Sequence, residues 1–239
     1  MRNLGKSSIV ALVAVMLISP AIWADEDDGG LTGFAQELEW SISMDYFSKY
    51  VWRGQNLQDD GAFQPGASIG YGGFSVSWWG SVDLSDINGE NGELTESDWT
   101  FDYTADVPGV DWADFSVGYI DYHFPGGLSH TKEFYWGFAF DVFANPSITF
   151  FHDLDEADGT YISFDFGHSW DNIFEITEDM PVGMDLSLGF GWGDSDYNTF
   201  YWGVDDSAVN DFHVSLGFPI DVYGWTLTPS LNYVTLPSS

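Results

Sequence analysis

Apolar and polar residues alternate with a period of two along most of the chain, and residues 38–54 (LEWSISMDYFSKYVWRG) show this most clearly. The apolar positions there are Leu38, Trp40, Ile42, Met44 and Tyr46, and charged or small polar residues stand between them. Only an extended strand places alternate residues on opposite faces. The run continues to Trp52, which gives the length that a tilted strand needs to cross a bilayer. We therefore predict that residues 38–54 form the first strand of an outer-membrane barrel.

Ten later segments repeat this pattern and are separated by turn-forming residues. They lie at 67–71, 74–82, 98–107, 115–119, 134–140, 147–152, 162–170, 182–192, 212–218 and 225–233. Long and short connections alternate, as in an up-and-down barrel with short periplasmic turns. Only the connection at 171–181 is too long for the short side.

The fold class expected from these segments is all-β, an antiparallel up-and-down transmembrane β-barrel. A soluble β-sandwich is the alternative, since it also uses alternating strands and turns. Three features favour the barrel: every strand is apolar on one face, aromatic residues recur at both strand ends, and the opposite face carries aspartates.

The beginning of the chain has the pattern of a secretory signal peptide. Arg2 and Lys6 precede an apolar run at 9–18, and a possible cleavage point follows Ala24. An uncleaved anchor is the alternative, although the run is short for a membrane-spanning helix. We predict a signal peptide at 1–24, a flexible acidic leader at 25–37 and one barrel domain at 38–239.

The strand count predicts a barrel that lacks its last strand. Barrels formed by single bacterial chains have an even number of strands. The eleventh predicted strand ends near the outer side, and no further alternating segment follows it. We therefore expect about 12 strands in the full product, of which 11 are present here, so that the first and eleventh strands face each other across a gap.

The charge of the chain restricts its partners. The sequence has 5 Lys and Arg residues against 38 Asp and Glu residues, and no acidic residue precedes Asp25. An exported chain with such an excess of acid does not attract nucleic acid or anionic lipid headgroups. The chain has no cysteine, so disulfides, thiol chemistry and thiolate metal sites are excluded.

The segment SMDYFSKYVWRGQNLQDDGAFQPGASIGY resembles the opening strands of the TorF-like family of porins. The matching positions are Tyr50, Trp52, Arg53, Gly54, Gln64 and Gly66, whereas Gln55 and Pro65 depart from the commonest forms of the motif. The resemblance implies an outer-membrane porin fold and says little about the substrate.

If the apolar face of each strand contacts lipid, the opposite face lines the lumen. The predicted pore-lining residues are Asp45, Lys49, Arg53, Trp79, Asp102, Tyr135, Asp165 and Asp185. Charges in such positions tune the selectivity of a porin. Lys49 and Arg53 either form a selective constriction or pair with acids to brace the interior, and both roles can hold together.

Other motifs give no convincing catalytic or metal site. The loop DLDEADG at 153–159 departs by one residue from the Asp-x-Asp-x-Asp-Gly spacing of calcium loops, which favours a solvated acidic loop. His213 and Ser215 form a His-x-Ser pair similar to that of outer-membrane phospholipase A, but on the polar face and without a third partner. The other histidines, at 123, 130, 152 and 168, stand singly.

The sequence thus predicts a non-enzymatic outer-membrane channel for passive diffusion of small solutes, favouring cations and needing no cofactor or metal. Its partners would be outer-membrane lipid and small solutes or cations. A closed barrel that serves as a surface receptor, adhesin or structural protein is the alternative, and an outer-membrane lipase is a remote one. The oligomeric state stays open.

Overall fold

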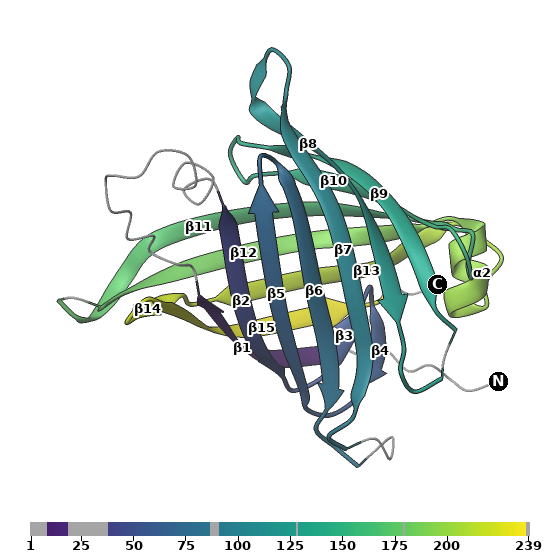
Figure 1. Cartoon of the computed structure of the whole chain (residues 1–239), viewed down its shortest axis with the longest axis horizontal. Coiled ribbons are helices and arrows are strands. Elements are labelled where there is room, and N and C mark those ends of the chain that lie inside the picture. Colours follow the sequence, from purple (N-terminus) through teal and green to yellow (C-terminus); the bar gives the residue numbers. More distant parts are fainter. Residues whose placement is uncertain (1–8, 19–37, 87–90, 128, 179, 238–239) are drawn as a thin grey trace.

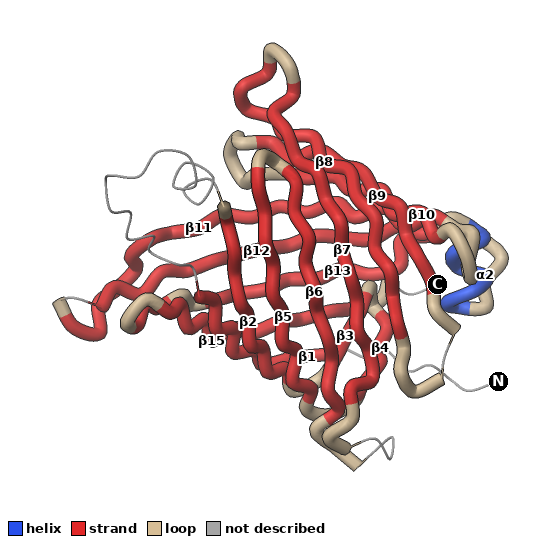
Figure 2. The backbone as a smooth tube through the Cα atoms, viewed as in Figure 1, coloured by secondary structure: helices blue, strands red, loops and turns tan. Residues whose placement is uncertain are grey.

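The computed structural model of the chain describes residues 9–18, 38–86, 91–127, 129–178 and 180–237. Within these ranges the protein is almost entirely antiparallel β-structure with one short helix (Figures 1 and 2). The elements are β1 (Ile9–Ile18), β2 (Glu39–Phe47), β3 (Tyr50–Trp52), β4 (Gln55–Gln58), β5 (Ala62–Tyr71), β6 (Phe74–Asp83), β7 (Leu94–Val107), β8 (Val110–His123), β9 (Thr131–Phe140), β10 (Ser147–Asp153), β11 (Thr160–Thr177), β12 (Met180–Gly193), α2 (Ser195–Trp202), β13 (Ala208–Gly217), β14 (Ile220–Val222) and β15 (Trp225–Thr235).

The strands of the large sheet follow one another almost in chain order. The 13-stranded sheet has the order β1-β2-β5-β6-β7-β8-β9-β10-β11-β12-β13-β15-β14, and β3 and β4 form a separate hairpin. The sheet curls, with β5 to β8 on the near side and β11 to β13 behind them in Figure 1. This confirms the all-β class, and each of the eleven predicted strands is found in the sheet.

The two faces of the sheet differ as the alternation predicts. One face, here called the outer face, exposes large apolar side chains on nearly every strand. They include Trp40, Ile42, Met44, Ile69, Phe74, Trp99, Phe101, Phe134, Trp136, Leu188, Phe212, Val214, Leu231 and Tyr233. Cross-strand aromatic pairs stabilise this face: the rings of Trp136 and Phe150 stack at 4.2 Å, and those of Phe164 and Phe190 at 4.7 Å.

The opposite, inner face holds the buried polar groups. Ser81, Glu96, Glu133 and Asp211 are buried there, at the sheet end nearest α2. The core of the molecule is therefore polar and aromatic, and its large aliphatic side chains lie mainly on the outer face. Such an inversion is the arrangement that strands with one lipid-facing side require.

Two predicted boundaries are wrong. The connection expected at 171–181 is a continuation of β11 and β12, because the ladder runs from Trp170 paired with Met184 to Thr177 paired with Met180, with two irregularities. Aromatic and β-branched residues such as Ile173 and Phe174 favour this extended arm, and Pro181 near the start of β12 interrupts little. The connection between β11 and β12 is therefore short, like those between β5 and β6 and between β7 and β8 at the same end of the sheet.

The first predicted strand also ends earlier than expected. β2 stops at Phe47, where its register with β5 reaches Ala62, and Tyr50 and Trp52 belong to the β3–β4 hairpin. The rings of these two residues pack on inner-face rings, since Tyr50 lies 5.6 Å from Trp79 and Trp52 lies 6.2 Å from Tyr122. Burying these rings inside the curl of the sheet accounts for the break in the strand.

The apolar run assigned to the signal peptide forms β1. It pairs with β15 from Ile9 opposite Val234 to Ile18 opposite Trp225, and with β2 from Val13 opposite Phe47 to Ile18 opposite Ile42. In the described part of the chain β1 thus lies between β2 and β15, where a gap was predicted. The predicted leader at 25–37 lies outside the described residues.

Candidate functional site

The site is built around the tight turn between β3 and β4. Arg53 and Gly54 are the two residues of this turn, with φ of 46° and 81°, and Trp52 pairs with Gln55 across it. Two-residue hairpin loops require positive φ, which favours glycine. A Cβ on Gly54 would also meet Leu236 Cδ2 at 2.7 Å and Asp211 Cβ at 2.9 Å. The Arg-Gly pair therefore lets the hairpin tip enter the interior of the sheet.

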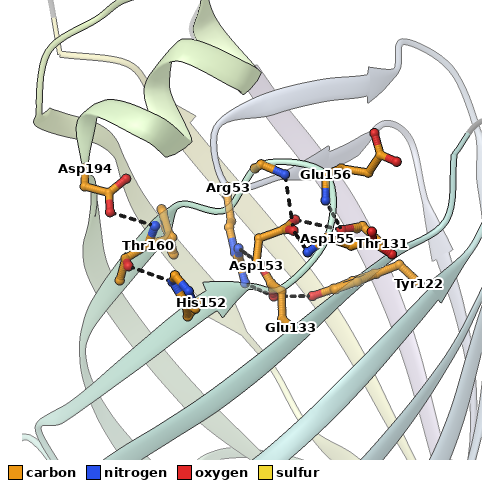
Figure 3. A network of polar contacts seen from close by, with 12 residues as sticks. Arg53, Tyr122, Thr131, Glu133, His152, Asp153, Asp155, Glu156, Thr160 and Asp194 are labelled. Carbon is orange, nitrogen blue, oxygen red and sulfur yellow. Dashed lines mark hydrogen bonds and ion pairs between the residues drawn. The ribbon is translucent and has the colours of Figure 1, made fainter.

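The Arg53 side chain lies at the centre of the polar network in Figure 3. Its guanidinium donates two parallel hydrogen bonds to the Glu133 carboxylate, at 2.6 and 2.7 Å, and Tyr122 Oη donates to the same carboxylate at 2.7 Å. The two charged side chains are 9% and 2% exposed. The fork geometry of this pair is the strongest that an ion pair in a protein adopts.

Three aromatic rings surround the Arg53 guanidinium. Its Cζ lies 4.5 Å from the ring of Trp52, 4.3 Å from Phe151 and 4.5 Å from Tyr161. Burial by itself would lower the pKa of Arg53, but the Glu133 carboxylate more than offsets this and holds the pKa well above its usual value. Arg53 is thus a permanently charged group fixed from all sides.

The loop at 154–159 folds around its own leading aspartate. Asp153 accepts hydrogen bonds from Thr131 Oγ1 at 2.8 Å, from the Asp155 backbone at 2.8 Å and from the Ala157 backbone at 3.2 Å (Figure 3). Its carboxylate is therefore used to hold the loop against β9. Within the described residues no group of three or more acidic or histidine side chains has the arrangement of a metal site.

Helix α2 covers this loop and the Arg53 turn. Asp194 caps the helix by accepting from the Tyr197 backbone at 2.9 Å, and it also accepts from the Thr160 backbone at 2.9 Å. Tyr197 is buried, its ring lies 5.4 Å from that of Tyr161, and burial raises its pKa. A Cβ on Gly159 would collide with the Tyr197 backbone, so the helix lies directly on the loop.

A cavity of about 380 Å³ lies beside the Arg53 cluster. Its lining includes Arg53, Phe151, Tyr161, Asp165, Asp211 and His213. His213 Nε2 lies 2.8 Å from Asp165 Oδ1, and its Nδ1 lies 3.3 Å from Asp211 Oδ1. Tyr161 Oη donates to Asp211 at 2.9 Å. One wall of the cavity is therefore polar, and its carboxylates, Asp165 and Asp211, are held in place by hydrogen bonds with His213 and Tyr161.

The His-x-Ser pair does not form a catalytic arrangement. Carboxylates face both ring nitrogens of His213, which fits a ring that donates from both of them. The partners of its ring nitrogens among the described residues are Asp165 and Asp211, and Ser215 is not one of them. Both ring nitrogens of His213 are therefore occupied by carboxylates, and neither is placed to accept a proton from Ser215.

The predicted pore-lining residues do not all lie together. Arg53 and Asp165 line the cavity, whereas Asp102, bonded to Tyr135 Oη at 2.6 Å, and Asp45 and Asp185 lie farther along the inner face. Trp79 packs on Tyr50. Lys49 lies apart from all of these, because it pairs with the exposed Asp59 beyond the end of β2. Lys49 and Arg53 both pair with acids, but only the Arg53 pair is buried.

The motif residues of the family resemblance lie on two neighbouring elements. Tyr50, Trp52, Arg53 and Gly54 form the hairpin, and Gln64 and Gly66 are on the inner face of β5. Gln64 donates to Ser81 Oγ at 3.4 Å, and a Cβ on Gly66 would meet Ser43 Oγ at 2.6 Å.

Several site residues were not predicted. Glu133 and Asp211 share their strand parity with Tyr135 and His213, so the alternation could have assigned them to the inner face. Tyr197 had no such signal, because its segment was predicted to be a loop and its helix is only eight residues long.

The chain matches no family model, and no curated protein or solved structure is similar to it. Among the described residues no helix has the length and apolar character needed to span a membrane.

Proposed function

We propose that this chain forms a transmembrane β-barrel in the bacterial outer membrane and acts as a non-enzymatic diffusion channel that favours small cations. The observation that carries the proposal is the division between the two sheet faces. Large apolar residues such as Phe74 and Trp99 are 66% and 48% exposed on the outer face, whereas the inner face carries carboxylates. A bilayer would remove that apolar surface from water and leave the polar face around a lumen.

Closure of the sheet is part of this proposal. β1 lies between β2 and β15 and pairs with both, so a single strand is enough to join these two edges. In the exported chain, from which β1 is removed, closure requires another strand in this position or direct pairing of β2 with β15. Hydrocarbon offers no hydrogen-bond partners, so a spanning sheet has to be closed. The resemblance of the segment at 50–66 to TorF-like porins agrees with this architecture.

We also propose that the chain is exported by a cleaved signal peptide. β1 belongs to that peptide and would be absent from the exported protein. β1 is apolar at all ten positions, whereas its neighbours alternate. Its register sets Val15 opposite Asp45, and one carboxylate oxygen of Asp45 is buried without a hydrogen-bond partner. Mass spectrometry of the protein from outer membranes tests this: we expect a chain that begins at Asp25, and a chain that retains residues 9–18 would make β1 a permanent strand.

The preference for cations follows from the charges on the inner face. Asp45, Asp102, Asp165 and Asp185 were all expected there, and Asp211 adds another carboxylate. The Arg53 charge is balanced by Glu133, and His213 lies between two acids. Acidic linings favour cations because they raise the local cation concentration and repel anions.

A second candidate is a closed barrel that acts as a surface receptor, adhesin or structural protein. The observation that favours it is the packing of Arg53, Glu133 and Tyr197, which are buried together where α2 covers one end of the sheet. A cluster of this kind narrows or blocks a water path.

Single-channel recording in planar bilayers separates the two candidates. The exported chain is compared with its Arg53→Ala variant, which removes the guanidinium from the covered end. Channel activity in both proteins, larger in the variant, is the expected result. If neither protein shows channel activity although protease protection in vesicles shows normal insertion, the result would contradict the proposed channel and support the closed barrel.

A further inference from the structure

A second cavity, of about 600 Å³, lies at the same end of the molecule as α2. Its walls come from the β3–β4 hairpin, the starts of β7 and β9, the segment after β8, and α2. Three lining residues, Tyr122, Thr131 and Glu156, are visible in Figure 3 on the side of the network away from Asp194. The volume is within the range of sites that hold small organic molecules.

Aromatic rings make up much of the cavity wall. They are Tyr50, Trp52, Tyr122, Phe124, Phe200 and Tyr201. Trp52 anchors the group, since its ring lies 5.4 Å from Tyr201 and 6.2 Å from Tyr122 in edge-on geometry. Phe200 is 50% exposed and stands at the rim. Ring faces attract cations through their quadrupoles, and weakly hydrated organic cations gain most from this.

The charge in the lining is of one sign. Asp83, Glu96 and Glu156 line the cavity, and none of the lining residues is Lys, Arg or His. Arg53 touches Trp52, but both of its hydrogen-bonded arms are held by Glu133 and it lines the other cavity. The cavity therefore offers negative charge without a competing positive side chain.

Glu96 is the group that most needs a positive partner. It is 5% exposed, its carboxyl is hydrogen-bonded to the side chains of Tyr50 and Asp98, and it forms no ion pair with any described residue. Asp98, two residues along the same strand, is also buried, with one oxygen that has no hydrogen-bond partner. Burying acids without a counter-charge is costly, and a bound cation relieves that cost.

We propose that this cavity is a binding site for a small organic cation that carries a primary or quaternary ammonium group. The rings of Trp52 and Phe200 contact the ammonium group of the ligand, and Glu96 supplies the charge complement. A neutral ligand of the same shape, a sugar included, leaves Glu96 without a partner. The site does not depend on conduction, so a barrel without channel activity can still bind the ligand.

Isothermal titration calorimetry on the detergent-purified full chain tests the site with choline as the probe. The matched neutral probe is 3,3-dimethylbutan-1-ol, which has the same shape without the charge. Choline is expected to bind at least tenfold more tightly than the alcohol, because cation–π and carboxylate contacts together contribute more than about 1.4 kcal/mol, the equivalent of one factor of ten. Equal affinity for the two probes, or preference for glucose, would overturn the proposal.

Two variants locate the binding. Phe200→Ala removes an exposed ring and is expected to weaken choline binding about fivefold, whereas Phe143→Ala removes an 89% exposed ring from the opposite end and serves as the control. Glu96→Gln is expected to weaken binding about tenfold while leaving the alcohol unchanged. Choline binding that all three variants retain unaltered would show that the ligand binds elsewhere and would refute this assignment.

Discussion

Replacement of Glu133 by glutamine is the most informative perturbation of the interior. Glutamine has nearly the same volume and keeps one carbonyl oxygen for Arg53 or Tyr122, but it removes the negative charge. The Arg53 guanidinium would then be a buried cation facing three rings and no carboxylate. The substitution therefore isolates the charge of the ion pair from its packing.

The expected cost can be worked out from the geometry. Both side chains are less than a tenth exposed, and the two hydrogen bonds are 2.6 and 2.7 Å long. Breaking a buried pair by removing one partner costs roughly 3–5 kcal/mol. The rings of Trp52, Phe151 and Tyr161 still stabilise the cation, so we expect the lower end of this range, a loss of about 3 kcal/mol in the free energy of unfolding.

The assay is equilibrium unfolding in urea of the protein folded into lipid vesicles, followed by tryptophan fluorescence. The double variant Arg53→Met/Glu133→Gln completes a thermodynamic cycle. It is expected to be more stable than Glu133→Gln alone, with a coupling energy of about 2 kcal/mol, because it leaves no unpaired charge. Lys49→Met at the exposed Lys49–Asp59 pair is the control and is expected to change stability by less than about 0.5 kcal/mol.

Two results would refute this reasoning. One is a Glu133→Gln protein whose stability equals that of the wild type within about 0.5 kcal/mol. The other is a double variant whose loss equals the sum of the two single losses, since the two side chains would then not interact.

The remaining predictions concern other parts of the same end of the molecule. Gly54→Ala should cost about 2 kcal/mol more than Gly72→Ala in the same urea assay, because both glycines have positive φ but only at Gly54 does a Cβ meet Leu236 and Asp211; equal losses would contradict this. The Asp59 carboxyl is hydrogen-bonded to Lys49 and should titrate below its usual pKa of 3.8 in NMR spectra, so its small stabilising contribution is present at higher pH and is lost as the pH falls through the lowered pKa. Lys49→Met should return the pKa of Asp59 to its usual range, and a pKa that does not change in this variant would contradict the pairing. Asp165→Asn should reduce the preference of the channel for cations measurably, with Glu175→Gln on the exposed arm as the control; identical selectivity in both variants would remove Asp165 from the conduction path.

The period of two predicted most of the fold because each strand meets a different environment on each side. This reading succeeds where a strand spans the whole sheet, as in β2 or β7. It misplaces the ends of elements, because Tyr50 and Trp52 keep the parity of β2 although their hairpin has left the sheet. The arm of β11 and β12 was missed because turn-forming and acidic residues such as Asp171 and Glu178 interrupt its alternation.

The partners in the site depend on spatial relations that alternation does not encode. Parity assigns Asp165 and Arg53 to the interior, but it does not show that Arg53 meets Glu133, 80 residues away in the chain. Only the register of the intervening strands brings these two residues to one level. The position of Tyr197 depends on a short helix whose own sequence has little amphipathic character, so tertiary contacts with Gly159 and Asp194 fix it.

The central claim is that an acid-lined barrel conducts cations, and the reversal potential in planar bilayers tests it most directly. The exported chain is inserted between solutions that differ tenfold in KCl concentration, and the voltage at zero current is recorded. The account predicts a reversal potential displaced toward the equilibrium potential of K⁺. A value of zero, a displacement toward the equilibrium potential of Cl⁻, or no current from correctly inserted protein would contradict it.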